Sequence, residues 1–183
     1  IASFTELISV AVHAVSRFEK FSHSRKDVIG VWGDGNVGFI TALVLKALYP
    51  DSKILVFGTV YDKLAYFSFA DSVYHVDRIP DGVTVDHAFE CVGGEGSRFA
   101  LAQIVEMIKP EGSIALMGVS ERYVDINTRD VLEKGLFLFG SSRSGVADFQ
   151  KTMDILAENP KIPAYLENII GDVVEVKTIS DIH

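Results

Sequence analysis

The sequence predicts an α/β fold in which six parallel strands form one doubly wound sheet. Short apolar runs alternate along most of the chain with segments long enough for helices. The first of these runs, Val28–Trp32, enters a glycine-rich turn that leads directly into a helical pattern. Apolar residues make up 48% of the 183 residues, which is ample for a core. A strand–helix alternation of this kind gives a parallel sheet with helices on both faces.

The other strands are expected where a short apolar run lies between turn-forming residues. They are Lys53–Phe57, Ser72–His75, Val85–Glu90, Ser113–Met117 and Leu136–Gly140. Two of the helices have clear ends in the sequence. Phe39–Leu48 stops before Pro50, and Ser97–Ile108 stops at the Lys109-Pro110-Glu111-Gly112 turn.

The two ends of the chain lie outside this alternation. Residues 4–20 form a helical pattern with one apolar face, and Tyr165–His183 offers a possible strand at Asp172–Val176. We therefore expect a linking helix and joint over residues 1–27, a sheet domain over 28–160, and a segment over 161–183 that returns toward a second domain. Because the chain begins at Ile1, inside a helical pattern, we expect it to be a fragment or a processed chain.

The turn after the first strand has the pattern G-x-G-x-x-G, formed by Gly33, Asp34, Gly35, Asn36, Val37 and Gly38. Strand, turn and helix in this order are the dinucleotide-binding fingerprint of Rossmann domains. Gly33 permits the tight turn, Gly35 lets the backbone approach a pyrophosphate, and Gly38 lets helix and strand pack closely. The N–H groups at the start of the helix attract phosphate. The alternative is a turn that binds nothing, which the strand before it and the helix after it disfavour.

The end of the second strand distinguishes NAD from NADP. An NAD enzyme usually carries an Asp or Glu there, which accepts hydrogen bonds from the ribose hydroxyls. This strand ends in Gly58 and Thr59, so it carries no carboxylate that repels a 2′-phosphate. Thr59 can donate its hydroxyl, and Lys63 can supply a positive charge, so the sequence favours NADP. The alternative is that Thr59 and Lys63 are an ordinary turn residue and surface residue.

Charge and cysteine content disfavour several classes of function. A net charge of −8 argues against nucleic-acid or membrane-surface partners, because no broad cationic field offsets a polyanion. The single cysteine, Cys91, excludes an intrachain disulfide framework and a cysteine-rich zinc site. No apolar run reaches the length of a membrane span and no signal-peptide pattern is visible, so we expect a cytoplasmic protein.

Four motifs resemble those of the coenzyme-binding half of the zinc-containing, medium-chain alcohol and polyol dehydrogenases, and they follow one another in the same order as in that family. They are Gly33–Gly38, Phe89–Gly94, Ile108–Gly112 and Leu116–Val119. The helix Glu6–Val15 resembles the segment that enters this domain in polyol dehydrogenases. More narrowly, the chain is similar to the bacterial ribulose-5-phosphate reductases, also called ribitol-5-phosphate dehydrogenases, at Val31–Gly38, Val56–Thr59 and Phe139–Ser144.

The resemblance implies further cofactor contacts at the carboxyl ends of strands. Cys91 and Val92 would line the ribose and nicotinamide side, and Gly118 and Val119 would lie against the nicotinamide ring. The backbone around Ser142 would meet the carboxamide of that ring. By residue type alone, Cys91 also fits a small buried apolar position, and Val119 fits any strand end.

In this family the catalytic zinc and its ligands, a cysteine and a His-Glu pair, come from a preceding GroES-like catalytic domain. This chain lacks that set, so we assign it no catalytic residue. Glu6 matches a glutamate near the zinc in polyol dehydrogenases, although Leu7 replaces the proline that commonly follows. A glutamate in the first turn also stabilises the helix dipole. The histidines that resemble acid–base groups have no partner at a catalytic spacing and are expected to be structural; they are His13, His75 and His87.

The resemblance therefore implies the NADPH-binding part of a zinc-dependent oxidoreductase that reduces D-ribulose 5-phosphate to D-ribitol 5-phosphate, for CDP-ribitol and then teichoic acid or capsule. Zinc would polarise the substrate carbonyl and the nicotinamide would deliver hydride. Arg143 would hold a phosphate of the cofactor or of the sugar phosphate. A homodimer through the sheet edge near Leu136–Gly140 is also implied. Two alternatives stay open: another zinc-type alcohol or sorbitol dehydrogenase, and a non-catalytic module that senses NADPH.

Overall fold

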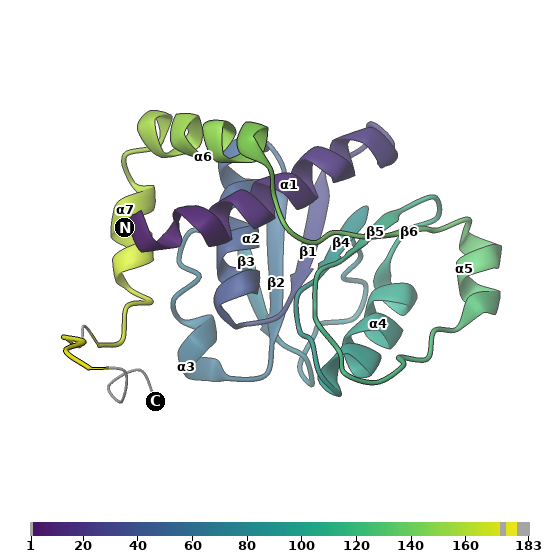
Figure 1. Cartoon of the computed structure of the whole chain (residues 1–183). Helices are drawn as coiled ribbons and strands as arrows, with labels where there is room; N and C mark the ends of the chain where they lie inside the picture. The colour runs from purple at the N-terminus through teal and green to yellow at the C-terminus, as the bar shows by residue number, and fades with distance from the viewer. Residues whose placement is uncertain (1, 173–174, 179–183) are drawn as a thin grey trace.

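The computed structural model describes residues 2–172 and 175–178 and contains one six-stranded sheet (Figure 1). Its strands are β1 (Val28–Trp32), β2 (Lys53–Gly58), β3 (Ser72–His75), β4 (His87–Glu90), β5 (Ser113–Leu116) and β6 (Phe137–Gly140). They lie in the order β3-β2-β1-β4-β5-β6, and every neighbouring pair is parallel. The predicted fold class and all six predicted strands are confirmed, with small differences at the strand ends.

Helices cover both faces of this sheet (Figure 1). The helical elements are η1 (Ala2–Phe4), α1 (Thr5–Phe21), α2 (Asn36–Leu48), α3 (Tyr61–Leu64), α4 (Gly96–Met107), α5 (Thr128–Lys134), α6 (Val146–Glu158) and α7 (Ile162–Glu167). Within the described residues, none of them has the length and apolar character of a membrane span.

Alternate residues of the central strands supply two separate hydrophobic cores. Ile29 and Val31 of β1 pack into the core that contains α1 and α2, whereas Trp32 packs into the core that contains α4. Ile54 and Leu55 of β2 divide in the same way. Strands buried on both faces are typical of parallel sheets, and this explains why they form continuous apolar runs in the sequence.

Helix α1 is an integral part of the first core. Its apolar face is buried, and the ring of Phe18 makes edge contacts with His87 and Phe89 at 4.9 and 5.2 Å between centroids. The predicted helix over residues 4–20 is therefore confirmed. This segment, expected from the sequence to be a joint, packs in the structure against α2 and α6.

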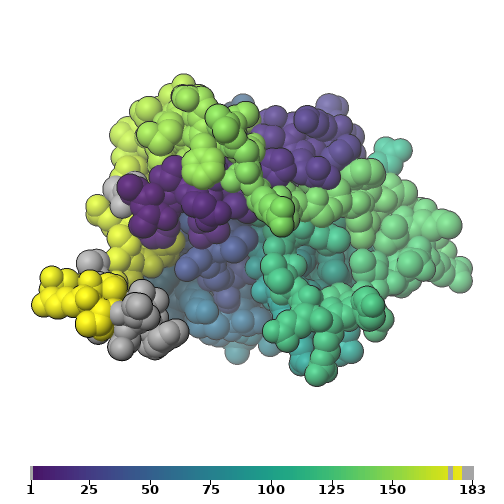
Figure 2. Space-filling view, in the orientation of Figure 1, coloured from purple at the N-terminus to yellow at the C-terminus, as the bar shows by residue number. Residues whose placement is uncertain are grey.

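The segment after β6 runs beside α1 toward α6, green beside purple in Figure 2. A hydrogen bond of 2.8 Å between the hydroxyls of Ser9 and Ser144 joins this segment to α1. The possible strand at Asp172–Val176 is not seen at residues 172, 175 and 176, and residues 173 and 174 lie outside the described residues.

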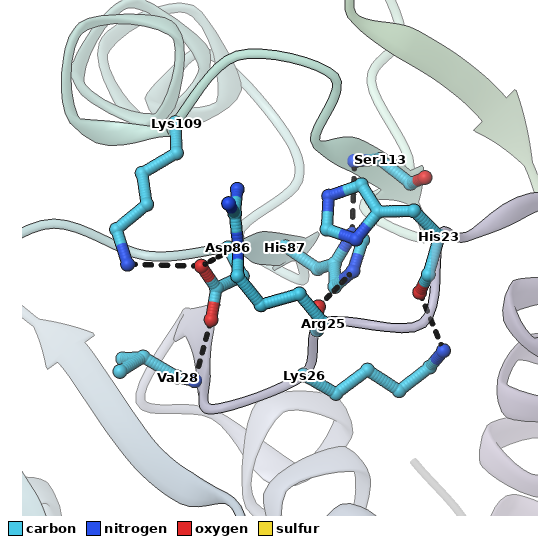
Figure 3. Close-up of polar contacts among 8 residues, drawn as sticks. All are labelled: His23, Arg25, Lys26, Val28, Asp86, His87, Lys109 and Ser113. Carbon is cyan, nitrogen blue, oxygen red and sulfur yellow. Dashed lines mark hydrogen bonds and ion pairs between the residues drawn. The ribbon is translucent and has the colours of Figure 1, made fainter.

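A cluster of charged side chains around one buried carboxylate lies at the amino ends of β1 and β4 (Figure 3). The fully buried carboxylate of Asp86 accepts hydrogen bonds of 2.9 Å from Arg25, from Lys109 and from the Val28 N–H group. Burial alone would raise the pKa of Asp86, but the hydrogen bonds from Lys109 and Val28 and the nearby charges hold it below its usual value. The cluster therefore fixes the segment before β1 to the end of the sheet opposite the glycine-rich turn.

His87 lies beside this cluster and uses both ring nitrogens (Figure 3). The Ser113 N–H group donates to Nδ1 at 3.1 Å, so Nε2 carries the proton and donates to the Arg25 carbonyl at 2.9 Å. Burial, followed by the charge of nearby His23, lowers the pKa of His87 to about 4. The ring is therefore neutral at pH 7, which agrees with the structural role expected for it.

Candidate functional site

A cleft of about 850 Å³ opens at the carboxyl ends of the central strands. It lies where the chain leaves β3 on one side of β1 and continues at β4 on the other, which is the switch point where open α/β sheets bind ligands. Eight of the residues predicted to bind the cofactor line this cleft: Gly33, Asp34, Gly35, Gly58, Thr59, Lys63, Cys91 and Val92.

The glycine-rich turn forms one wall because its backbone segments approach too closely for side chains. Gly33 has φ +129°, and a Cβ there would lie 2.8 Å from the carbonyl oxygen of Cys91. A Cβ at Gly38 would overlap the carbonyl oxygen of Gly33. Gly35, the N-cap of α2, faces open space, since a Cβ there would meet no described heavy atom within 4 Å. This arrangement fits a phosphate group at the start of α2, where Asn36 is exposed and Val37 is half-buried.

The carboxylate of Asp34 lies against the end of β2. Its Oδ2 atom accepts hydrogen bonds from the N–H groups of Thr59 and Val60 at 2.7 and 2.8 Å, and a longer one of 3.4 Å from the Thr59 hydroxyl. The strand itself carries no acid, as expected, but the expectation that no carboxylate lies at its end is wrong, because the fold brings Asp34 there from the turn after β1. The exposed Lys63 also lines this part of the cleft.

His75 lies at the same end of the cleft, a position that was not predicted from its sequence surroundings. The Asp77 N–H group donates to Nδ1 at 3.3 Å, so Nε2–H donates to the Thr59 carbonyl at 2.9 Å. The imidazole also stacks on the ring of Tyr61, with centroids 4.6 Å apart. His75 therefore supports the loop that carries Thr59. Its position at the end of the predicted strand Ser72–His75 was the sequence signal that could have placed it at this edge of the sheet.

Cys91 and Val92 continue the cleft at the end of β4. Burial raises the pKa of the Cys91 thiol to about 12, and the thiol donates to the Thr41 hydroxyl at 3.7 Å. A thiol that stays protonated at neutral pH is a poor nucleophile, so Cys91 contributes a small apolar surface. Val92 is exposed beside it.

The other predicted cofactor residues lie outside this cleft. Val119 lines a second hollow of about 610 Å³, which shares the Phe99 side chain with the first, and Gly118 precedes it at the end of β5. Ser142 and Arg143 are exposed in the segment after β6 and line neither hollow. Arg143 has φ +67°, an uncommon conformation for a residue with a side chain.

The residues considered for metal or acid–base chemistry are dispersed. Glu6 is exposed in the first turn of α1, and His13 pairs with Asp148 of α6 at 2.9 Å. Over residues 2–172 and 175–178, no group of three or more His, Cys, Asp or Glu side chains is placed to hold a metal ion. The described part of the chain thus does not form a zinc site by itself.

Comparison with known proteins gives consistent matches. Residues 64–158, about half of the chain, match the family described as zinc-binding dehydrogenase. The chain is 54% identical to the ribulose-5-phosphate reductase of Bacillus spizizenii and 55% identical to ribulose-5-phosphate reductase 1 of Staphylococcus aureus, each over 182 residues. These alignments cover 100% of this chain and 53% of each relative, so the chain spans about half the length of the curated relatives it matches.

Solved structures agree with this assignment. The crystal structure of S. aureus TarJ in complex with NADPH has a TM-score of 0.93 and 55% identity, covering 98% of this chain and 57% of that one. The D-arabinose dehydrogenase of Sulfolobus solfataricus, at 21% identity and a TM-score of 0.72, covers 86% of this chain and 50% of that one and shares the fold. With the family match and the dinucleotide-binding geometry together, the chain belongs to the zinc-binding dehydrogenase family.

Proposed function

We propose that this chain is the NADPH-binding part of a cytoplasmic, zinc-dependent oxidoreductase that reduces D-ribulose 5-phosphate to D-ribitol 5-phosphate, a step toward CDP-ribitol for teichoic acid or capsule. The observation that carries the proposal is 54–55% identity to ribulose-5-phosphate reductases along the whole chain. The structure of a 55% identical relative with NADPH supports the choice of cofactor.

The residues of the cleft fit this cofactor. The backbone of Gly33–Gly38 and the start of α2 would receive the pyrophosphate, because Gly35 faces open space there. Thr59 and Lys63 would meet the 2′-phosphate, and the Asp34 carboxylate beside them is engaged by backbone N–H groups. Cys91, Val92, Gly118 and Val119 would face the nicotinamide half. When bound, NADPH supplies the hydride, and these residues hold it in place.

The remainder of the enzyme would supply the metal. We propose residues 28–160 as the NADP-binding Rossmann domain, with residues 1–27 leading from a GroES-like catalytic domain and residues 161–183 returning toward it. Because the described residues do not form a zinc site, no step of metal chemistry is assigned to them, and Glu6 is proposed only as a residue near the zinc of the complete enzyme.

The sheet edge offers a surface for a second copy of the enzyme. β6 is the last strand of the sheet, so one side of its backbone has no neighbouring strand among the described residues. The tilted rings of Phe21 (α1) and Phe137 (β6) contact each other with centroids 5.0 Å apart, although both side chains are about two-fifths exposed, at 41% and 42%. Exposed aromatic side chains along an unpaired edge favour the proposed homodimer.

The substrate assignment is tested by assaying the protein that contains both this chain and the zinc-bearing half. It should reduce D-ribulose 5-phosphate with NADPH, and kcat/KM for unphosphorylated ribulose should be about ten- to a hundredfold lower, the value of one charge-assisted contact. The 183-residue chain alone should show no turnover and hold no stoichiometric zinc after washing with chelator. Efficient oxidation of sorbitol or a simple alcohol, without reduction of ribulose 5-phosphate, would contradict the assignment.

Arg143 provides a more specific test of phosphate recognition. We propose that its exposed guanidinium binds the phosphate of the sugar, so Arg143→Ala should raise KM for the sugar phosphate about tenfold or more and leave KM for NADPH unchanged. Arg143→Gly is the matched control, since glycine tolerates φ +67° while also lacking the guanidinium. If both variants raise KM for the sugar phosphate equally, the effect comes from the lost charge. A rise in KM for NADPH alone would contradict the proposal and place Arg143 at the cofactor.

A further inference from the structure

Glu90, the last residue of β4, is a buried carboxylate whose partners come from two loops. Its side chain is 2% exposed. Oε1 accepts hydrogen bonds from the N–H groups of Val92 and Gly93 at 2.9 and 3.2 Å and from the Ser97 hydroxyl at 3.0 Å. Oε2 accepts one of 3.2 Å from the N–H group of Gly118, which also donates to the Glu90 carbonyl. Charge-assisted bonds of this kind offset the cost of burying the carboxylate.

These bonds hold the loops after β4 and β5 together as one unit. A Cβ at Gly118 would lie 2.6 Å from Glu90 Oε2 and would overlap the Gly93 nitrogen. The Gly94 N–H group donates to the Val119 carbonyl at 2.8 Å. The Ser120 hydroxyl adds a hydrogen bond of 3.0 Å to the Gly94 carbonyl. The Glu90 carboxylate lies between the two loops and binds backbone N–H groups of both, so a change at Glu90 removes contacts from each loop at once.

The two loops joined by Glu90 lie on one side of the site only. Val92 lines the 850 Å³ cleft and Val119 lines the hollow beside it, both on the β4 and β5 side of β1. Thr59 and Lys63 lie at the end of β2, on the opposite side of β1. Within the described residues, none of the four groups that donate to the Glu90 carboxylate belongs to the β2 end.

We propose that Glu90 is a positioning residue for the nicotinamide half of the cofactor: its carboxylate sets the loops that carry Val92 and Gly118, while the adenosine half is bound independently of it. This inference rests on the proposed function, and it predicts that the two halves of NADPH respond differently when Glu90 is changed.

The test uses Glu90→Gln, which keeps the shape of the side chain and replaces one acceptor oxygen with an NH2 donor. At the Oε1 position that donor faces the N–H groups of Val92 and Gly93, and at the Oε2 position it faces the N–H group of Gly118, so either orientation of the amide sets a donor against a donor. Titration calorimetry of the purified chain should show NADPH affinity reduced about ten- to a hundredfold and affinity for adenosine 2′,5′-bisphosphate, which lacks the nicotinamide half, changed less than about twofold. Ser97→Ala is the matched control, because it removes one donor and leaves the backbone bonds in place.

Thermal unfolding of each variant checks that the fold is retained. If Glu90→Gln weakens both ligands equally, or neither, the carboxylate has no specific role in positioning the nicotinamide side and the inference is overturned. If the unchanged chain does not bind NADPH, the proposed function itself fails, so the two failures are distinguishable.

Discussion

Replacing Gly38 with alanine is expected to abolish measurable NADPH binding, with a loss of more than about a hundredfold in affinity. The added Cβ overlaps the Gly33 carbonyl oxygen, and this is a contact between backbone atoms that no side-chain rotation relieves. The Gly33 carbonyl cannot easily yield, because the Gly33 N–H group is tied to the Phe57 carbonyl at 2.8 Å. Helix α2 must therefore move away from the turn, which separates the N–H groups that receive the pyrophosphate.

The same substitution should destabilise the fold by about 1–3 kcal/mol, as overpacking of a tight interior contact does. Gly35→Ala is the matched control, because its Cβ meets no described heavy atom within 4 Å. That variant should keep its free energy of unfolding to within about 0.5 kcal/mol while binding NADPH more weakly, since the methyl group enters the cleft. Urea unfolding and calorimetry measure both quantities, and wild-type NADPH affinity in Gly38→Ala would refute the assigned role of the turn.

Acidification from pH 6.5 to pH 4 is expected to remove about 3 kcal/mol of stability through His87, at about 1.4 kcal/mol per pKa unit. The pKa of His87 falls from an ordinary 6.5 to about 4 in the fold, so the unfolded chain binds a proton in this range and the folded chain does not. The stability that the neutral His87 ring contributes is therefore fully present above pH 6.5 and is lost as the pH falls toward 4. Protonation of Nδ1 would also set a proton against the Ser113 N–H group.

Urea unfolding between pH 7 and pH 4 measures this effect. His87→Gln removes the titration and should give a flatter pH profile, though from a lower starting stability. The fold lowers the pKa values of Asp71 and Asp86, so the stability that these carboxylates contribute is lost mainly below their ordinary pKa of 3.8. Parallel pH profiles for the two proteins would show that His87 is not the group responsible.

The fold could be predicted because its signals are local. Each strand of the sheet is a short apolar run, and the turn from β1 to α2 contains its own glycine signature, so neither requires knowledge of distant contacts. The location of the cleft follows from the same signals, since parallel strands end at one edge. Gly33, Gly35, Thr59 and Cys91 consequently line one cleft there.

Contacts between distant segments could not be predicted in this way. Asp34 reaches Thr59 across 25 positions, and Glu90 reaches Gly118 across 28. Neither pair has a sequence pattern, because the pairing depends on the order of the strands in the sheet. The packing of α1 depends equally on its partner α6, which lies more than a hundred residues later.

The central claim, that this chain holds NADPH through the end of β2, is tested most directly by titrating the purified chain with NADPH and with NADH in a calorimeter. NADPH should bind about ten- to a hundredfold more tightly, since Thr59 and Lys63 would contribute a charge-assisted contact to its 2′-phosphate. Lys63→Ala should remove most of this difference by weakening NADPH alone. Equal affinities for the two cofactors, or tighter binding of NADH, would contradict the claim.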